Sequence, residues 1–306
     1  MECEVSSAVL ATKASWPFDD PNAEVILRSS DNVDFRVFRC NLSLASPVFK
    51  DMFTLGAPVH GEHPPNPSSL PVVPLSETGS ALDALLRLIY PLTTPKLDSV
   101  GDIKALVAAV VKYDLIEPAI YRATNLIIRQ YLQSSPVSLY AIACLCGWRN
   151  LAERAARETL KIKDFGRVRT YVAELEDMSA GDYYRLLDYH RACATAAHTT
   201  DIQTELHIAF PLLRSEVGED IDIPALLCNC PMHVLSHQWF HEYMTVTREG
   251  LLRRPDPSTV KDRSFLGVLE GTTVCSRMAL HLDQISDIYA RAVDGAISKV
   301  KLEFKQ

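Results

Sequence analysis

Residues 24–53, EVILRSSDNVDFRVFRCNLSLASPVFKDMF, decide how the first part of this chain folds. Residues 24–28 form a short, mostly apolar run that is rich in β-branched side chains. Residues 29–32 (SSDN) are a turn cluster, because Ser, Asp and Asn side chains bond to their own backbone. Apolar and polar side chains then alternate along residues 33–38, with the two-residue period of a strand. The stretch therefore predicts a β-hairpin.

The second half of this stretch changes to a helical period. The apolar residues at that spacing are Leu42, Ala45, Val48, Phe49, Met52 and Phe53. The dipeptide Ser46-Pro47 interrupts them, because proline suits the first position of a helix and serine can cap it. We therefore expect two short helices after the hairpin.

This order of elements resembles the start of a BTB/POZ domain. The family signature is Asp-Val, a hairpin, Phe-x-x-His-Lys and Leu-x-x-x-Ser-x-x-Phe-x-x-x-Phe. It is matched here, with the same spacing, by Glu24-Val25, Phe35, Phe38-Arg39, Leu42, Ser46, Phe49 and Phe53. Glu24 replaces the usual Asp, and Phe38 replaces the usual His. The resemblance covers about residues 21–133. A looser likeness, to BTB proteins of filamentous and mushroom-forming fungi with a helical extension, continues to about residue 200.

The resemblance implies an α+β fold in which helices cap a small BTB/POZ-like sheet, followed by an all-α C-terminal part. It also implies self-association, with a homodimer as the expected form. The candidate interaction residues are large and apolar, and each could serve as contact or as core: Phe35, Phe38, Leu42, Phe49, Met52 and Phe53.

Charge and apolar patterning argue against two classes of partner. The net charge of the chain is −7, and it divides into −4 over residues 1–133 and −3 over residues 134–306. Neither part has the basic footprint of a nucleic-acid-binding domain, so we expect no direct DNA binding. The apolar runs, such as residues 105–111, are far shorter than the roughly 20 residues of a membrane span.

The N-terminus and the cysteines point to a reducing compartment. Glu2 and Glu4 stand where a secretory signal would carry basic residues. The 8 cysteines are scattered, so we expect buried or idle thiols and no disulfide framework. The expected location is cytoplasmic or nuclear.

The rest of the first domain reads as a strand and helices between loops. Residues 1–20 form an N-terminal arm that either packs Trp16 and Phe18 on its own domain or is exchanged in a dimer. Prolines and glycines make residues 54–71 a loop. Val72-Val73 predicts an edge strand, and helices are expected to open at Ser80, Ser99 and Glu117 and to bury apolar faces that include Leu82, Ile103, Val111 and Ile127.

After residue 133 the chain turns helical. Residues 134–200 predict helices that begin at Pro136, Asn150 and Ser179 and resemble a BACK-like extension. Residues 201–306 form a C-terminal segment that ends in a long helix over residues 278–300. Its apolar stripe, which runs from Met278 through Ile285 and Tyr289 to Ala296, either docks on the helical domain or forms a coiled coil with a partner.

One group of residues has the chemistry of a zinc site: Cys228, Cys230, His233, His237, His241, Cys275 and His281. Thiolates and imidazoles are the ligands that zinc prefers, but the spacing differs from that of common zinc fingers, so reduced cysteines with surface histidines are the alternative. Gln238 follows His237 where a metalloprotease needs a general base. The sequence has no Gly-x-Gly-x-x-Gly, P-loop or Gly-x-Ser-x-Gly motif. We therefore predict no catalytic residue, cofactor or metal ligand.

The sequence thus predicts a non-enzymatic protein–protein interaction module or adaptor that self-associates through its BTB-like domain. Two roles remain open within that class: substrate receptor for a cullin-type ubiquitin ligase, and scaffold for transcriptional or signalling complexes. Cullin-binding members carry a hydrophobic-x-Glu motif after the third helix, whereas residues 90–95 (YPLTTP) contain no Glu. A zinc-containing module built on the segment from Cys228 to His241 is the alternative from another class.

Overall fold

A computed structural model of the chain describes residues 11–55, 70–90, 94–167, 171–202, 233–262 and 276–304. The chain divides into two compact units, Met1–Ser135 and Pro136–Gln306. In the described ranges the chain is α+β, with 10 α-helices and one four-stranded sheet. The boundaries that the sequence suggested after residues 20, 133 and 200 stay predictions, and the second of them lies close to the observed division.

The sheet of unit 1 has the strand order β1-β3-β2-β4. Its strands are β1 (Thr12–Lys13), β2 (Val25–Arg28), β3 (Val33–Val37) and β4 (Val72–Pro74). β2 and β3 are antiparallel, with Leu27 opposite Phe35, which confirms the hairpin. Asn32 takes the left-handed conformation in the turn (φ 60°), and Asn is among the residues that tolerate it best. β1 pairs in parallel with β3, and β4 pairs in parallel with β2 as the expected edge strand.

The described part of the N-terminal arm is built into unit 1. Its strand β1 lies on the chain's own β3, and the backbone N–H of Arg36 donates to the Phe18 carbonyl at 2.9 Å. Phe18 is buried, with its ring centroid 5.8 Å from that of Phe35, so its predicted packing is confirmed. The predicted packing of Trp16 is wrong, because that side chain is 62% exposed.

Two short helices, α1 (Arg39–Ala45) and α2 (Pro47–Leu55), follow the hairpin as predicted. Ser46 separates them, and its hydroxyl accepts from the Phe49 N–H (3.0 Å) while it donates to the Tyr113 carbonyl. The Phe49 ring stacks on the Tyr113 ring at 4.4 Å between centroids. The buried Ser46 therefore caps the start of α2 and also bonds this start to Tyr113, which is far away in the sequence.

Three longer helices complete unit 1: α3 (Gly79–Ile89), α4 (Val100–Lys112) and α5 (Glu117–Tyr131). Ser99 caps α4 in a capping box with Asp102, and α5 begins at Glu117, as predicted. The predicted cap at Ser80 is wrong, because Thr78 caps α3 instead. Val111, expected inside, is exposed because it lies outside the buried face of α4.

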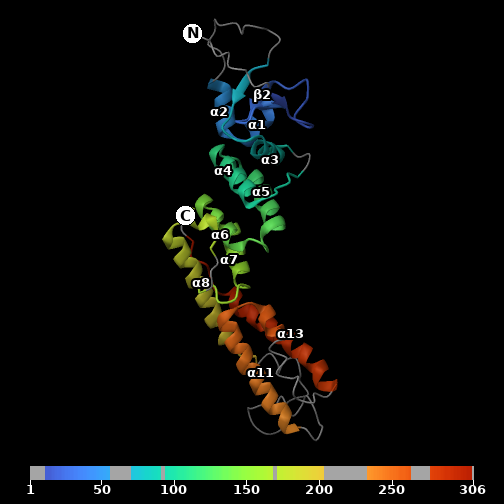
Figure 1. The fold of residues 1–306 in the computed structure, drawn as a ribbon, viewed down its shortest axis with the longest axis vertical. Coiled ribbons are helices and arrows are strands. Elements are labelled where there is room, and N and C mark those ends of the chain that lie inside the picture. The colour runs from blue at the N-terminus through green and yellow to red at the C-terminus, as the bar shows by residue number, and fades with distance from the viewer. Residues whose placement is uncertain are drawn as a thin grey trace, which may run out of the picture. The chain divides into compact units, whose positions relative to one another are not determined.

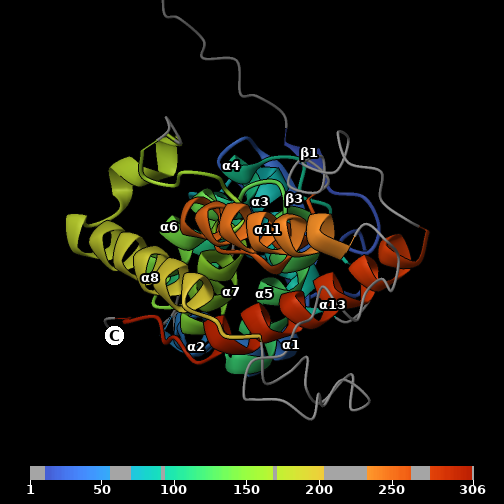
Figure 2. The ribbon, with the colours of Figure 1, turned by 90° about the horizontal axis from the view of Figure 1, so that it is seen from below.

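The described part of unit 2 is wholly helical (Figures 1 and 2). Its elements are α6 (Pro136–Cys146), α7 (Arg149–Thr159), the 3-10 helix η1 (Ala173–Asp177), α8 (Ala180–His198), α11 (His233–Arg253), the 3-10 helix η3 (Pro257–Lys261) and α13 (Ser276–Ser298). Gly147 ends α6 in the left-handed conformation (φ 69°). The predicted helices of this region are confirmed, including the long C-terminal one.

Helix α13 docks on its own unit, because its described apolar residues are buried there. Ile285, Tyr289, Val293 and Ile297 are all inaccessible to solvent, and α13 packs against α8 and η3. This favours the docking interpretation of the stripe over a coiled coil. The stripe differs from the predicted one toward the C-terminus, where Val293 and Ile297 are buried in place of Ala292 and Ala296.

Candidate interaction surface

The described residues hold no group of three or more His, Cys, Asp or Glu side chains placed to bind a metal. The predicted zinc candidates lie almost entirely outside the described side chains, and His241, the exception, is exposed on α11. The zinc hypothesis therefore stays a prediction from the sequence.

Three of the described cysteines do not have the surroundings of nucleophiles. Burial raises the pKa of Cys144, Cys146 and Cys193 to about 11 in each case. Such thiols stay protonated near neutral pH, and the thiol is a poor nucleophile compared with the thiolate. Cys193 is buried in α8 and serves as a small core residue, as the sequence suggested for most of the cysteines.

Three of the six predicted interaction residues belong to the core of unit 1. Phe35, Leu42 and Phe49 are buried, and their side chains face the interior from β3, α1 and α2. A side chain that is already buried offers no surface to a partner, so these three are core residues rather than contact residues.

The other three are partly exposed. Phe38 directly precedes α1, and its backbone N–H donates to the Tyr90 hydroxyl at 2.8 Å. Phe53 stacks on Phe49 at 6.2 Å between centroids, and the Arg39 guanidinium lies 5.6 Å from the Phe53 ring centroid. Met52 is half-buried on α2. These positions remain candidates for contact with a partner.

The same two helices carry apolar side chains that face solvent. Leu44 on α1 is 77% exposed and Leu55 at the end of α2 is 84% exposed. We call the exposed and half-exposed apolar residues of these helices the α1–α2 patch, which comprises Leu44, Val48, Met52, Phe53 and Leu55. The sequence analysis missed Leu44 and Leu55. Their signal is that each is a leucine outside the buried face of its helix, a position where a polar residue is expected.

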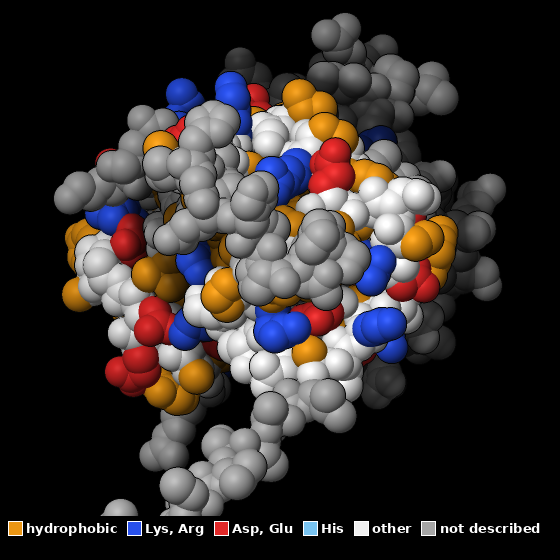
Figure 3. Space-filling view, turned by 90° about the horizontal axis from the view of Figure 1, so that it is seen from above, with side chains coloured by type: hydrophobic (Ala, Val, Ile, Leu, Met, Phe, Trp, Pro, Cys, Tyr) orange, Lys and Arg blue, Asp and Glu red, His pale blue; other side chains and the backbone are white. Residues whose placement is uncertain are grey.

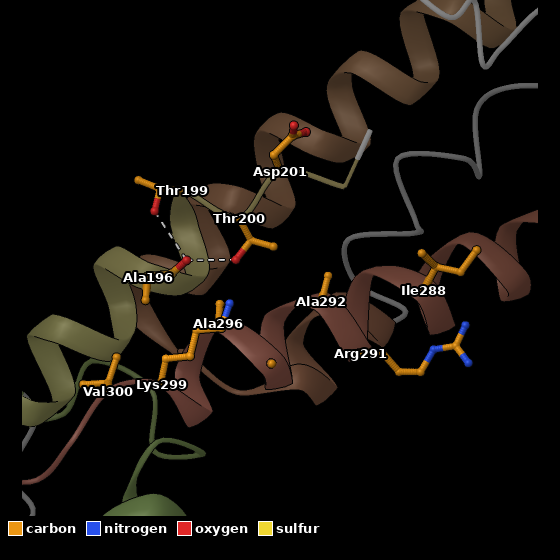
Figure 4. A pocket seen from close by; sticks show the side chains of 11 residues that line it. Ala196, Thr199, Thr200, Asp201, Ile288, Arg291, Ala292, Ala296, Lys299 and Val300 are labelled. Atoms are coloured by element: carbon orange, nitrogen blue, oxygen red, sulfur yellow. Dashed lines mark hydrogen bonds between the residues drawn. The ribbon is translucent and has the colours of Figure 1, made fainter. Parts of the chain in front are cut away.

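A hollow in the described part of unit 2 is lined mostly by small side chains. It holds about 930 Å³ between the C-terminal ends of α8 and α13 (Figure 4). Its walls are mainly small residues of α13 and α8, and the hydroxyl of Thr200 donates to the Ala196 carbonyl at 2.8 Å. Its lining residues include Asp201 and Lys299 but no Cys, His or Ser.

Charges on the described surface are mixed. On the face shown in Figure 3, basic and acidic side chains alternate with apolar ones, without a large area of one sign. A nucleic-acid interface needs an extended basic area, so this face does not have the character of one.

Within the described residues, no helix combines the length and apolar character that crossing a bilayer requires. No protein-family model matches the sequence, and no curated protein shows significant similarity to it.

Proposed function

We propose that this chain is a non-enzymatic interaction module that binds a second copy of itself through the α1–α2 patch of unit 1. The observation that carries the proposal is the exposure of Leu44 and Leu55 on two helices that pack together and also carry the half-buried Met52 and Phe53. Single exposed apolar residues are ordinary, but a group of them on two adjacent short helices is typical of a surface that another protein covers.

Two further considerations support a second copy of the chain as the partner. The hairpin followed by two short helices resembles the start of a BTB/POZ domain, and that resemblance implies self-association. The charged residues of α2, Lys50 and Asp51, carry opposite charges. A helix that carries both signs can meet a copy of itself without net repulsion, as a two-fold interface requires.

The cullin-receptor and zinc-module alternatives have no specific support among the described residues. The module proposed here has no catalytic step, and its activity is assembly. Its C-terminal helical unit would then recruit a further protein, in agreement with an adaptor role.

Co-purification of two differently tagged copies of the full chain tests the proposal. The wild-type copies should purify together. The double variant Leu44→Asp, Leu55→Asp in both copies should abolish co-purification, because each aspartate would place a charge in the interface. Both side chains are exposed in the single chain, so the substitutions should change its stability by no more than about 0.5 kcal/mol.

Leu252→Asp is the matched control, because Leu252 is an exposed leucine on α11 of unit 2. It should leave co-purification unchanged. Undiminished co-purification of the Leu44→Asp, Leu55→Asp protein would overturn the assignment to the α1–α2 patch.

A further inference from the structure

A second candidate surface lies on unit 1 between the C-terminal end of α3 and the exposed side of α5. It is a pocket of about 320 Å³. Its lining combines three arginines, two tyrosines and an apolar floor, and it contains no Asp or Glu. The residues that matter below are Arg87, Arg122, Arg129, Tyr121, Asn125 and Leu126.

The three arginines differ in their state of pairing. Arg87 already binds both carboxylate oxygens of Asp83, at 2.7 and 3.0 Å, so its charge is compensated within unit 1. Arg122 uses its Nε–H to bind the Leu88 carbonyl at 2.8 Å. Among the residues that the structure describes, Arg122 and Arg129 form no ion pair. The pocket therefore keeps two positive charges that no carboxylate of the described residues balances.

These two guanidiniums sit on one side of α5. Arg122 and Arg129 are seven residues apart, which is about two helical turns and brings them to the same face. Asn125 lies between them, and Tyr121 beside them is 70% exposed. The bond to Leu88 holds the Arg122 side chain in place before any ligand arrives, which lowers the entropic cost of binding.

Asp83, the carboxylate that contacts a lining residue of this pocket, is already bound to Arg87. The local excess of positive charge stands out further because residues 1–133 carry a net charge of −4. An anionic group is the natural complement of such a site.

We propose that this pocket binds an acidic peptide segment of a partner protein, with carboxylates on Arg122 and Arg129 and an apolar side chain over Leu126 beside the Tyr121 ring. Guanidinium binds carboxylate in a two-pronged geometry, and an exposed tyrosine supplies contact area at low entropic cost. A nucleic acid fits less well, because two unpaired cations on an acidic unit would not offset the repulsion of a polyanion.

This inference goes beyond self-association, since it concerns a different partner and different elements. The α1–α2 patch is apolar and lies on α1 and α2, whereas the pocket is cationic and lies on α3 and α5. Together they would let one copy of unit 1 pair with another and still hold an acidic segment of a third protein.

Fluorescence anisotropy with the full chain tests the pocket. The probe is a fluorescein-labelled peptide that repeats Asp-Glu-Leu, and its uncharged counterpart repeats Asn-Gln-Leu. The acidic peptide should bind saturably and more weakly as salt is raised, and the uncharged one should bind at least about tenfold more weakly. Arg129→Glu should weaken the acidic peptide about tenfold or more, because a charge pair becomes a repulsion.

Two further variants test whether the geometry of the guanidinium and the position of the charge matter, beyond net charge. Arg122→Lys keeps the charge and should weaken binding less than Arg122→Ala, since only the fork geometry is lost. Arg154→Glu changes the net charge by the same amount as Arg129→Glu but lies on the exposed side of α7, so it should leave the affinity unchanged.

Equal binding of both peptides, or equal effects of Arg129→Glu and Arg154→Glu, would overturn the proposal. Displacement of the acidic peptide by an unrelated single-stranded oligonucleotide at equal concentration would also overturn it, because the site would then select charge alone. The Leu44→Asp, Leu55→Asp protein should bind the peptide normally. That result keeps a failure of this proposal distinct from a failure of self-association.

Discussion

The aromatic cluster around the sheet of unit 1 and the α6–α7 contact of unit 2 are built from side chains of different size. Unit 1 fills its interior with large rings, such as Phe18, Phe35 and Phe49, around a small sheet. Unit 2 brings α6 and α7 together over alanines, including Ala152 and Ala155, which are fully buried. A core of large side chains is damaged most by deletion, whereas one of small side chains at a close helix contact is damaged most by enlargement.

A polar cluster in unit 1 and a buried histidine in unit 2 differ in how far they are hydrogen-bonded. In unit 1 the Tyr113 hydroxyl donates to Glu77 at 2.6 Å, and Lys112 binds the same carboxylate at 2.7 Å. In unit 2 the ring of His190 stacks on Phe165 at 5.2 Å between centroids, and its Nε2 has no hydrogen-bond partner among the described residues. The buried imidazole of His190 is therefore a group through which the stability of unit 2 depends on pH.

The largest expected effect is in unit 1. Phe49→Ala should destabilise it by about 3–5 kcal/mol, because it removes a fully buried ring that stacks on Tyr113 and leaves a cavity. Urea denaturation followed by circular dichroism measures the loss, and hydrogen exchange of β2 and β3 assigns it to unit 1. Leu44→Ala, which shortens an exposed side chain, should change stability by no more than about 0.5 kcal/mol. Equal losses in the two variants would contradict the packing described here.

The next effect belongs to unit 2 and depends on pH. Burial lowers the pKa of His190 to about 4, against 6.5 for the free side chain, while a hydrogen bond to the Thr159 backbone acts in the opposite direction. The unfolded chain binds the proton more strongly, so the contribution of His190 is complete above pH 6.5 and is lost as the pH falls toward 4. The loss should reach about 3 kcal/mol.

Urea denaturation at neutral pH and at moderately acid pH, in wild type and in His190→Leu, checks this sign. The wild type should lose more stability on acidification than the variant, because leucine does not titrate. Parallel losses in both proteins would show that other groups control the acid sensitivity of unit 2.

A smaller loss is expected from enlarging the alanine contact. Ala152→Leu should cost about 1–3 kcal/mol, because α6 and α7 pack closely and the site has no room for the added methyl groups. Glu153→Leu is the control on the same helix, since Glu153 is exposed and its substitution should cost no more than about 0.5 kcal/mol. Thermal unfolding of the two variants measures the difference, and a neutral Ala152→Leu would mean that this contact is loose.

The smallest effect should be the same in both units. Ser99 caps α4 and Ser179 caps α8, each by accepting from the backbone N–H three residues on, at 3.1 Å. Ser99→Ala and Ser179→Ala should each cost about 1 kcal/mol in urea denaturation. A difference of more than about 1 kcal/mol between them would show that the surrounding core, and not the local cap, decides the cost.

Features fixed by local chemistry were predictable from the sequence. The turn after β2, the start of α2 at Pro47 and the capping box at Ser99 each depend on residues within a few positions of one another. Such patterns need no knowledge of the rest of the fold. The short turn also fixes which residues of β2 and β3 face each other.

Features fixed by distant contacts were missed. Thr78 replaces Ser80 as the cap of α3 because the Gly79 N–H binds the Asp31 carboxylate at 2.8 Å, which anchors the helix start beside the hairpin turn. A side chain at position 79 would also come within 3.0 Å of Val33. The parallel pairing of β1 with β3 is likewise a contact between segments separated in sequence, and local pattern says nothing about it.

The candidate surfaces were predictable only in part. The sequence pointed to the right helices, α1 and α2, but it could not separate the buried Leu42 and Phe49 from the exposed Leu44 and Leu55, because helical spacing alone does not say which face meets the sheet. The only sign of the cationic pocket in the sequence is the pair of arginines at positions 122 and 129, which are two helical turns apart. Its importance became visible only when the position of Asp83 showed which arginine was already neutralised.

The central claim is that unit 1 pairs with a second copy of the chain. Sedimentation equilibrium of the full wild-type chain, from submicromolar to tens of micromolar, tests it most directly. The account predicts that the weight-average mass rises from 34.1 kDa toward twice that value. A mass that stays at 34.1 kDa across the whole range would contradict it.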